Sequence, residues 1–147
     1  MCGPAEPTER AEALVLPARR YRCIGCGAVL LVVPCEVSPR RQYSAAAIGL
    51  ALALWGLLGA TAAQVRRRVS PAKVLGVAAA SGWASLRRWA KAVRRGALFP
   101  STPSSGPLAT LRQVAAAAAT ALAASTPPAL RRLPLVERAF FGAAQSA

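Results

Sequence analysis

Residues 44–69 read SAAAIGLALALWGLLGATAAQVRRRV, and the pattern of this stretch decides the fold class. Ser44 is a suitable N-cap for a helix that Gly59 ends, because a hydroxyl accepts a hydrogen bond from the free N–H groups of a first turn and glycine adopts the left-handed conformation after a last turn. Thr61 is a suitable N-cap for a second helix over residues 62–69. The stretch therefore predicts consecutive helices and a mainly α protein.

The first of these helices is also a candidate membrane span. Residues 44–63 are twenty residues without a charge, which is long enough for a helix to cross the hydrocarbon core. Eight of the twenty are alanine and three are glycine, and Gly59 and Thr61 divide the segment. Basic residues flank both ends, so the charges specify no orientation. We favour a buried helix of a bundle and keep a single-span membrane protein as the alternative.

Further capping signals follow the second helix. Residues 70–71, Ser-Pro, supply an N-cap and a first helical position for a third helix, which residues 81–82 end. A fourth helix is predicted over residues 83–95, with Gly96 as its C-terminal cap. Together these elements predict a helix-turn-helix-like domain over residues 43–99.

The segments on either side of this domain differ from it. Residues 1–42 are expected to hold a small β hairpin and a connector, because residues 19–34 read as two short strands around a cysteine-containing turn. Residues 97–107 contain three prolines and four Ser or Thr residues and read as a linker. An alanine-rich helix candidate over residues 108–124 and a short amphipathic piece follow. We expect residues 100–147 to be partly helical and only loosely docked.

The charge balance points to polyanionic partners. Nineteen Lys and Arg residues oppose five acids, which gives a net charge of +14, and seventeen of the nineteen are arginine. Such an excess favours nucleic acid or an anionic membrane surface, and arginine binds phosphate or guanine through paired hydrogen bonds. A GC-rich genome also raises the arginine content, but it does not explain why acids are scarce.

The absent residue types argue against an enzyme. The chain contains no His and no Asp, so neither a Ser-His-Asp nor a Cys-His nucleophile system can be built. A two-metal carboxylate site needs several acids that converge on the metals, and this chain has few to supply. The five acids are Glu6, Glu9, Glu12, Glu36 and Glu137. We therefore expect a non-catalytic protein.

The predicted helix over residues 83–95 has the clearest division into two faces. At about 100° per residue, one arc carries Trp83, Leu86, Trp89, Ala90 and Val93. The opposite arc carries Arg87, Arg88, Lys91, Arg94 and Arg95. A recognition helix in a major groove needs this arrangement, and an ordinary solvated basic face is the alternative. Near the end of the second helix, further candidates for phosphate contacts are Arg66, Arg67 and Arg68.

The cysteines suggest a zinc site. Cys23 and Cys26 form a CxxCG knuckle, in which a turn lets two thiolates face one ion. Cys2 with the glycine after it resembles the back half of a second knuckle, and its distance along the chain from Cys23 suits a zinc ribbon. Cys35 is the alternative fourth ligand, so the candidate set is Cys2, Cys23, Cys26 and Cys35. A loosely ordered hairpin with free thiols and a redox CxxC are the other interpretations.

A family resemblance follows from two runs of residues. RRYRC-x-x-CG with an apolar strand, and P-RR-x-YS-x-x-x-I-x-x-AL-x-LWG after it, resemble the N-terminal regions of bacterial insertion-sequence transposases and their stand-alone relatives. The resemblance covers about residues 19–99, and it implies a zinc ribbon that leads into a DNA-binding helix-turn-helix. The later stretch GW-x-SL-RRW resembles the recognition helix of that arrangement. The resemblance therefore implies Cys23 and Cys26 as zinc ligands, and Arg87, Arg88 and Lys91 on the reading helix. The first knuckle is incomplete relative to that pattern.

The sequence therefore predicts a mainly α protein, with a small N-terminal zinc-ribbon-like β hairpin followed by a helix-turn-helix-like bundle. Its expected partner is double-stranded DNA, and its candidate cofactor is zinc. The first eighteen residues lack the apolar run of a secretory signal, so we expect a cytoplasmic protein whose thiols stay reduced. The alternatives are the single-span membrane protein and a truncated reading frame that does not fold.

Overall fold

The computed structural model describes residues 2–13, 15, 18–32, 42–72, 82–103, 106 and 108–146. The strands are β1 (Cys2–Gly3), β2 (Glu12–Ala13), β3 (Arg19–Arg22) and β4 (Val29–Val32). The helices are α1 (Ala45–Gly56), α2 (Ala62–Val69), α4 (Ala84–Arg94), α5 (Leu111–Ala124), the 3₁₀ turn η1 (Pro128–Leu130) and α6 (Leu135–Gln145). Two small antiparallel hairpins precede the helices. Because the helices make up most of the regular structure, the mainly α fold class is confirmed. The predicted third helix falls almost wholly on residues 73–81, outside the described residues, so the helix-turn-helix arrangement stays a prediction.

The helix ends lie where the capping residues predict them. The Ser44 hydroxyl accepts a hydrogen bond at 3.1 Å from the first turn of α1. At the start of α2, the Thr61 hydroxyl accepts from the backbone N–H of Gln64 while the Gln64 side chain accepts from the backbone N–H of Thr61, so the two form a capping box. Gly59 and Gly96 have φ angles of 67° and 68°, the left-handed conformation that ends a helix at no steric cost to glycine.

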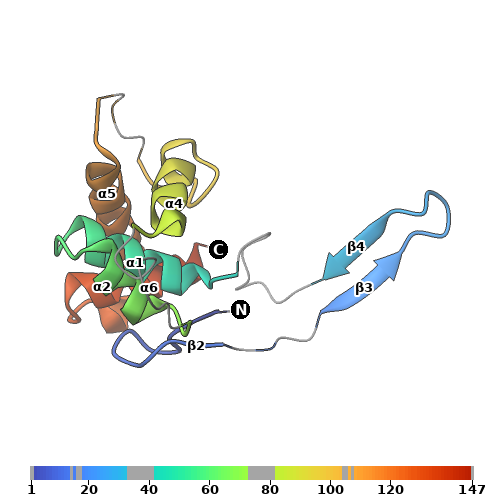
Figure 1. Ribbon diagram of the computed structural model, residues 1–147, viewed down its shortest axis with the longest axis horizontal. Helices are drawn as coiled ribbons and strands as arrows, with labels where there is room; N and C mark the ends of the chain where they lie inside the picture. Colours follow the sequence, from blue (N-terminus) through green and yellow to red (C-terminus); the bar gives the residue numbers. More distant parts are fainter. Residues whose placement is uncertain are drawn as a thin grey trace.

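Helix α1 is the centre of the bundle, and it contacts α2, α4, α5 and α6 (Figure 1). Eight of its twelve residues are buried. Packing on several sides accounts for its apolar character, because a helix that is apolar all round belongs in a core. The uncharged stretch 44–63 is not one helix, since α1 ends at Gly56 and spans only about 18 Å, against a hydrocarbon core of about 30 Å. No helix among the described residues has the length and apolarity to cross a membrane.

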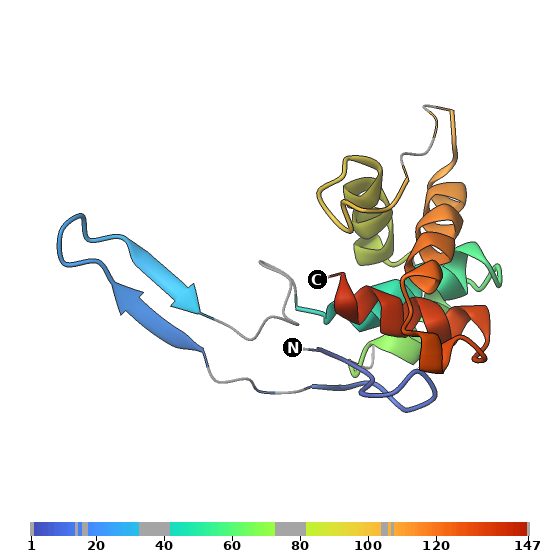
Figure 2. The same ribbon diagram turned by 180° about the vertical axis from the view of Figure 1, so that it is seen from behind.

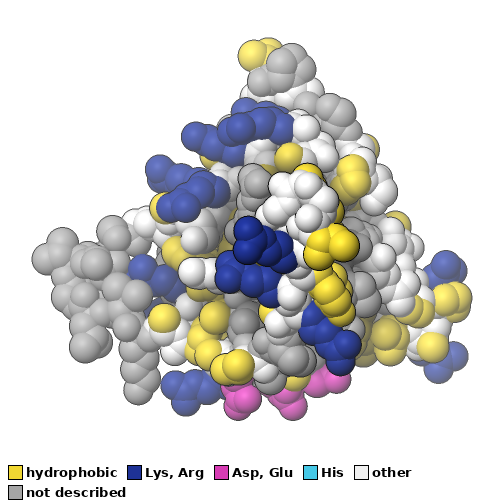
Figure 3. All heavy atoms as spheres, turned by 90° about the vertical axis from the view of Figure 1, so that its right-hand side faces the viewer, with side chains coloured by type: hydrophobic (Ala, Val, Ile, Leu, Met, Phe, Trp, Pro, Cys, Tyr) yellow, Lys and Arg dark blue, Asp and Glu magenta, His cyan; other side chains and the backbone are white. Residues whose placement is uncertain are grey.

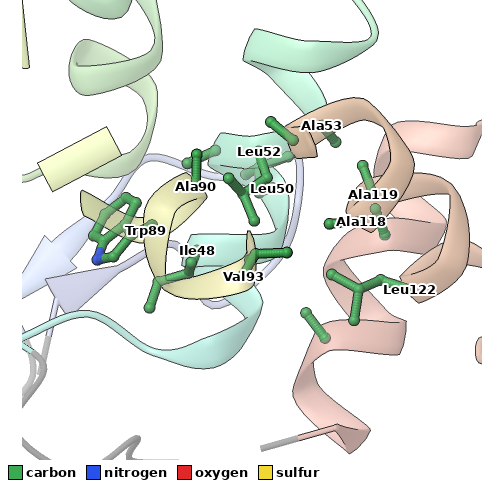
Figure 4. Packing of buried hydrophobic residues seen from close by; sticks show 14 of the residues in the cluster. Ile48, Leu50, Leu52, Ala53, Trp89, Ala90, Val93, Ala118, Ala119 and Leu122 are labelled. Carbon is green, nitrogen blue, oxygen red and sulfur yellow. The ribbon is translucent and has the colours of Figure 1, made fainter. Parts of the chain in front are cut away.

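The expectation of a loosely docked tail is wrong, because α5 and α6 complete the core. Both helices contact α1 and each other. Figure 4 shows Ala118, Ala119 and Leu122 of α5 across the apolar cluster from Trp89 of α4, with α1 side chains between them. These three α5 side chains are no more than 1% exposed. Residues 43–72, 82–103 and 108–146 therefore share one hydrophobic core.

Small residues explain how alanine-rich helices make this core. A Cβ atom at Gly49 of α1 would lie 2.8 Å from a backbone oxygen of α6. A Cβ at Gly56 would lie 2.7 Å from the Cα of Ala116 in α5, and a Cβ at Gly142 would lie 2.7 Å from the carbonyl carbon of Leu122. These distances are shorter than ordinary van der Waals contact, so the helices approach one another backbone to backbone. The close approach compensates for the small buried area of each alanine.

Three aromatic rings hold α4 against the rest of the bundle. Tyr43, Trp83 and Trp89 pack edge to face, with ring centroids 4.9 to 5.6 Å apart. The Tyr43 hydroxyl donates a hydrogen bond of 2.9 Å to the hydroxyl of Ser70, just beyond α2. Edge-to-face pairs stabilise by about 0.5–1.5 kcal/mol each beyond their buried area. The cluster therefore fixes the orientation of α4, and with it the direction of the basic face.

The two hairpins have different relations to the bundle. Strand β1 pairs with β2, and the backbone of Cys2 exchanges hydrogen bonds with Gln42 and Ser44 at the start of α1. Strands β3 and β4 form an arm that projects away from the helices (Figures 1 and 2). All eight residues of these two strands are exposed. The hairpin predicted over residues 19–34 is confirmed for the described residues 19–32.

Candidate nucleic-acid interface

Helix α4 has the two faces that the sequence predicts. Its buried residues are Leu86, Trp89, Ala90 and Val93, and Trp83 is buried just before it. Its exposed cations are Arg87, Arg88 and Lys91, with Arg94 and with Arg95 at the helix end. The first turn carries no acidic side chain. The structure therefore confirms the burial of the apolar arc and the exposure of the basic one.

The cations of α4 form a row along the helix. Arg87, Lys91 and Arg95 are spaced four residues apart, and such residues lie on one face about 6 Å from each other along the axis. Arg94 differs from them, because its guanidinium donates a hydrogen bond to the backbone carbonyl of Ala109 before α5. Arg94 therefore links α4 to the next segment, and the row offers the freer side chains for an anionic ligand.

The arginine triplet of α2 is less available than the sequence suggests. The guanidinium of Arg68 donates hydrogen bonds of 2.7 and 2.6 Å to the carbonyl oxygens of Glu9 and Pro7, which fastens the N-terminal segment to the bundle. Arg66 is half-buried, and Arg67 alone of the triplet is exposed. Helices α2 and α4 both pack on α1. The prediction of a phosphate contact thus fits Arg67, while Arg68 has a structural role that its sequence neighbours do not indicate.

The hairpin arm carries further exposed cations besides those predicted for the interface. Arg19, Arg20 and Arg22 lie in β3 and are exposed. Figure 3 views the molecule from the side that carries the arm, and it shows Lys and Arg side chains in several groups with acidic side chains only at the lower edge. The run RRYR indicates this surface in the sequence, because it places three arginines within four residues of one strand. The arm is therefore a second basic surface besides α4.

A cavity lined by two glutamates is unsuited to a polyanion. It lies beside the N-terminal segment and has a volume of about 480 Å³. Its walls include the side chains of Cys2, Glu9, Arg10, Glu12 and Ser44. Two carboxylates against one guanidinium disfavour an anionic ligand there. The candidate interface is therefore the surface of α4 and the arm.

Backbone hydrogen bonds close the turn at the tip of the arm, which carries Cys23 and Cys26. The backbone N–H of Gly27 donates to the carbonyl of Cys23 at 3.0 Å, and Gly27 has a φ of 72° that a side chain would strain. The backbone N–H of Cys26 donates to the Cys23 sulfur and lowers the pKa of that thiol, and the Cys26 side chain and the Gly25 N–H act in the same direction. These donors stabilise a thiolate at Cys23.

The predicted four-cysteine ligand set is not brought together. Cys2 lies in β1 beside the bundle, because it pairs with Ala13 of β2, whereas Cys23 and Cys26 lie at the far end of the arm (Figure 1). Within the part of the chain that the structure describes, no three Cys, His, Asp or Glu residues are grouped to hold a metal. Cys35 lies outside the described residues. A complete zinc ribbon that includes Cys2 is therefore wrong, and two thiols remain at the knuckle.

Comparisons with protein-family models, with curated proteins and with solved structures found no match to this chain. The resemblance to transposase N-terminal regions therefore stays a prediction.

Proposed function

We propose that this chain is a non-catalytic protein that binds double-stranded DNA through the basic face of α4. The observation that carries the proposal is the separation of α4 into a buried apolar face and an exposed face with five cations. Residues 37–96 contain no acid, so nothing in that part of the sequence neutralises the face. A merely solvated surface usually mixes charges of both signs.

The strength of the basic charge favours phosphate as the ligand. The cationic side chains of a chain of 147 residues with a net charge of +14 repel one another. A bound polyanion neutralises part of this charge and so reduces the repulsion. Each cation that neutralises a phosphate also releases a condensed counterion, which gives affinity without any base-specific contact. Arg87, Lys91 and Arg95 supply such contacts along one row, and Arg20 and Arg22 of the arm supply others.

The exposed side chains of α4 include cations and no aromatic ring, which favours a duplex over a single strand as the ligand. Non-specific binding of single strands relies on aromatic side chains that stack on the bases. The tryptophans at α4, Trp83 and Trp89, are at most 9% exposed, so this helix offers cations without a stacking surface. The exposed basic face of this eleven-residue helix suits a major groove, which admits one α-helix. We place this activity in the cytoplasm, where DNA is accessible and thiols remain reduced.

The test is a salt titration of binding to a fluorescent 20-base-pair duplex by the full chain, followed by anisotropy. With four to six phosphates contacted, the logarithm of the affinity should fall against the logarithm of the salt concentration with a slope of roughly −4 to −5. A single strand of the same length should bind more weakly. Absence of duplex binding at low salt, or binding that does not respond to salt, would overturn the proposal.

A further inference from the structure

The turn at the tip of the arm carries two thiols, which is half of the ligand number of a structural zinc site. Cys23 and Cys26 are both exposed, and the turn between them directs backbone N–H groups at the Cys23 sulfur. A structural zinc site takes four ligands, and cysteine thiolates are its commonest ones. Two further thiolates must therefore come from elsewhere.

The rest of the described chain does not offer them. Cys2 is held in β1 by pairing with Ala13, and the groups of metal ligands in the described part of the chain never reach three. The chain contains no histidine at all. A second copy of the same tip, in contrast, carries two thiols in the same geometry.

The arm is built so that a second copy can reach it. It projects from the bundle on both views (Figures 1 and 2), so neither bundle obstructs a tip-to-tip approach. The strand register pairs Tyr21 with Leu30, and paired residues of antiparallel strands share one face of the hairpin. Tyr21 is 50% exposed and Leu30 63% exposed, and Ile24 at the tip is fully exposed. An isolated two-stranded hairpin is marginal in water, so apolar contact with another arm would stabilise both.

We propose that two copies of this chain join through one zinc ion at the tips of their arms, with Cys23 and Cys26 of each copy as the four ligands. The contact is isologous, as a two-fold axis through the metal requires. Each thiol loses its proton to solvent when it binds, so one Zn²⁺ displaces four protons and the site carries a charge of −2. Arg22, next to Cys23 in each copy, offsets that charge. The inference concerns assembly and does not depend on the proposed DNA binding.

The experiment titrates the reduced, metal-free full chain with Co²⁺, then displaces it with Zn²⁺, and measures the mass in solution by light scattering. Tetrahedral thiolate absorption should saturate at one metal per two chains. The mass should double on metal addition and return to that of one chain with a chelator. One metal per chain at the monomer mass would overturn the proposal, as would absence of metal binding or a dimer that persists without metal.

Single cysteine variants identify the ligands. Cys23→Ser and Cys26→Ser should each abolish the metal-dependent dimer, and because both side chains are exposed, the circular dichroism spectrum should not change. Cys2→Ser and Cys35→Ser are the matched controls and should keep both the stoichiometry and the doubled mass. Loss of metal binding in the Cys35 variant would instead indicate a ligand set within one chain, and would overturn the proposal.

Discussion

Gly142→Ala tests whether α6 belongs to the core. Gly142 faces the end of α5, where an added Cβ would overlap the carbonyl oxygen of Leu122 and lie 2.7 Å from its carbonyl carbon. The neighbouring atoms cannot rotate away, because they belong to the backbone. The same region is also fixed by a hydrogen bond of 2.7 Å from the Thr126 hydroxyl to the carbonyl of Arg138.

The magnitude follows from two opposed terms. Glycine in a helix interior is less favourable than alanine by about 1 kcal/mol, so helix propensity alone predicts stabilisation. Contact between carbon atoms is best at about 3.5–4 Å, so α5 and α6 would have to separate by about 1 Å. Overpacking of this kind costs about 1–3 kcal/mol, and a backbone obstacle favours the upper end. The net destabilisation is then about 2 kcal/mol, or a Tm lower by about 4–8 °C for a domain of this size.

Thermal and urea unfolding followed by circular dichroism measure this effect. Ala144→Gly is the matched control, because Ala144 is exposed in the same helix and its change reports the propensity term alone, at most about 1 kcal/mol. Both variants should be destabilised, and Gly142→Ala more than the control. If Gly142→Ala is as stable as the parent or more stable, the close packing of α5 and α6 is refuted.

Three further predictions concern single side chains. Trp89→Ala should lower the free energy of unfolding by about 3–5 kcal/mol, because it empties a buried aromatic site. Arg87→Ala, on the exposed face, should have the melting temperature of the parent. Equal melting temperatures for the two variants would mean that α4 faces the other way. Arg68→Ala should release the N-terminal segment, because it removes the hydrogen bonds from the guanidinium to the carbonyls of Glu9 and Pro7. Limited proteolysis should then cleave the chain before α1 faster than in the parent. An unchanged cleavage rate would contradict the structural role of Arg68. In the metal-free chain, Cys23 should react with iodoacetamide near neutral pH faster than it does in the urea-unfolded chain, because hydrogen bonds to its sulfur lower its pKa in the folded protein and leave more thiolate. Equal labelling rates of the Cys23 peptide in the two states, measured by mass spectrometry, would argue against the hydrogen-bonded turn.

The sequence predicted the parts of the fold that are locally determined. The caps at Ser44 and Thr61 and the glycines at positions 59 and 96 act within one helical turn, so their positions along the chain were sufficient. The two faces of α4 follow from periodicity alone, and burial confirmed them. The strand–turn–strand around Cys23 is local in the same sense.

What the sequence did not predict depends on contacts between distant segments. The alanine-rich composition of α5 favours a loosely docked tail, because each alanine buries little surface. No sequence pattern indicates that Gly49, Gly56 and Gly142 let the helix backbones approach one another closely. The partners of Arg68 are carbonyl groups about sixty residues away, and a backbone carbonyl has no sequence signature. Cys2 matched a zinc-ribbon spacing, yet its pairing with β2 keeps it from the knuckle.

The most direct test of the account compares two doubly neutralised variants in the duplex titration. Arg87→Gln with Lys91→Gln removes two cations from the row on α4, and Arg131→Gln with Arg132→Gln removes two exposed cations between η1 and α6. Both variants lower the net charge of +14 by two, so they differ only in position. The first should bind the duplex more weakly with a salt slope shallower by about 2, and the second should keep the parent slope. Equal slopes for the two variants would contradict a binding surface on α4.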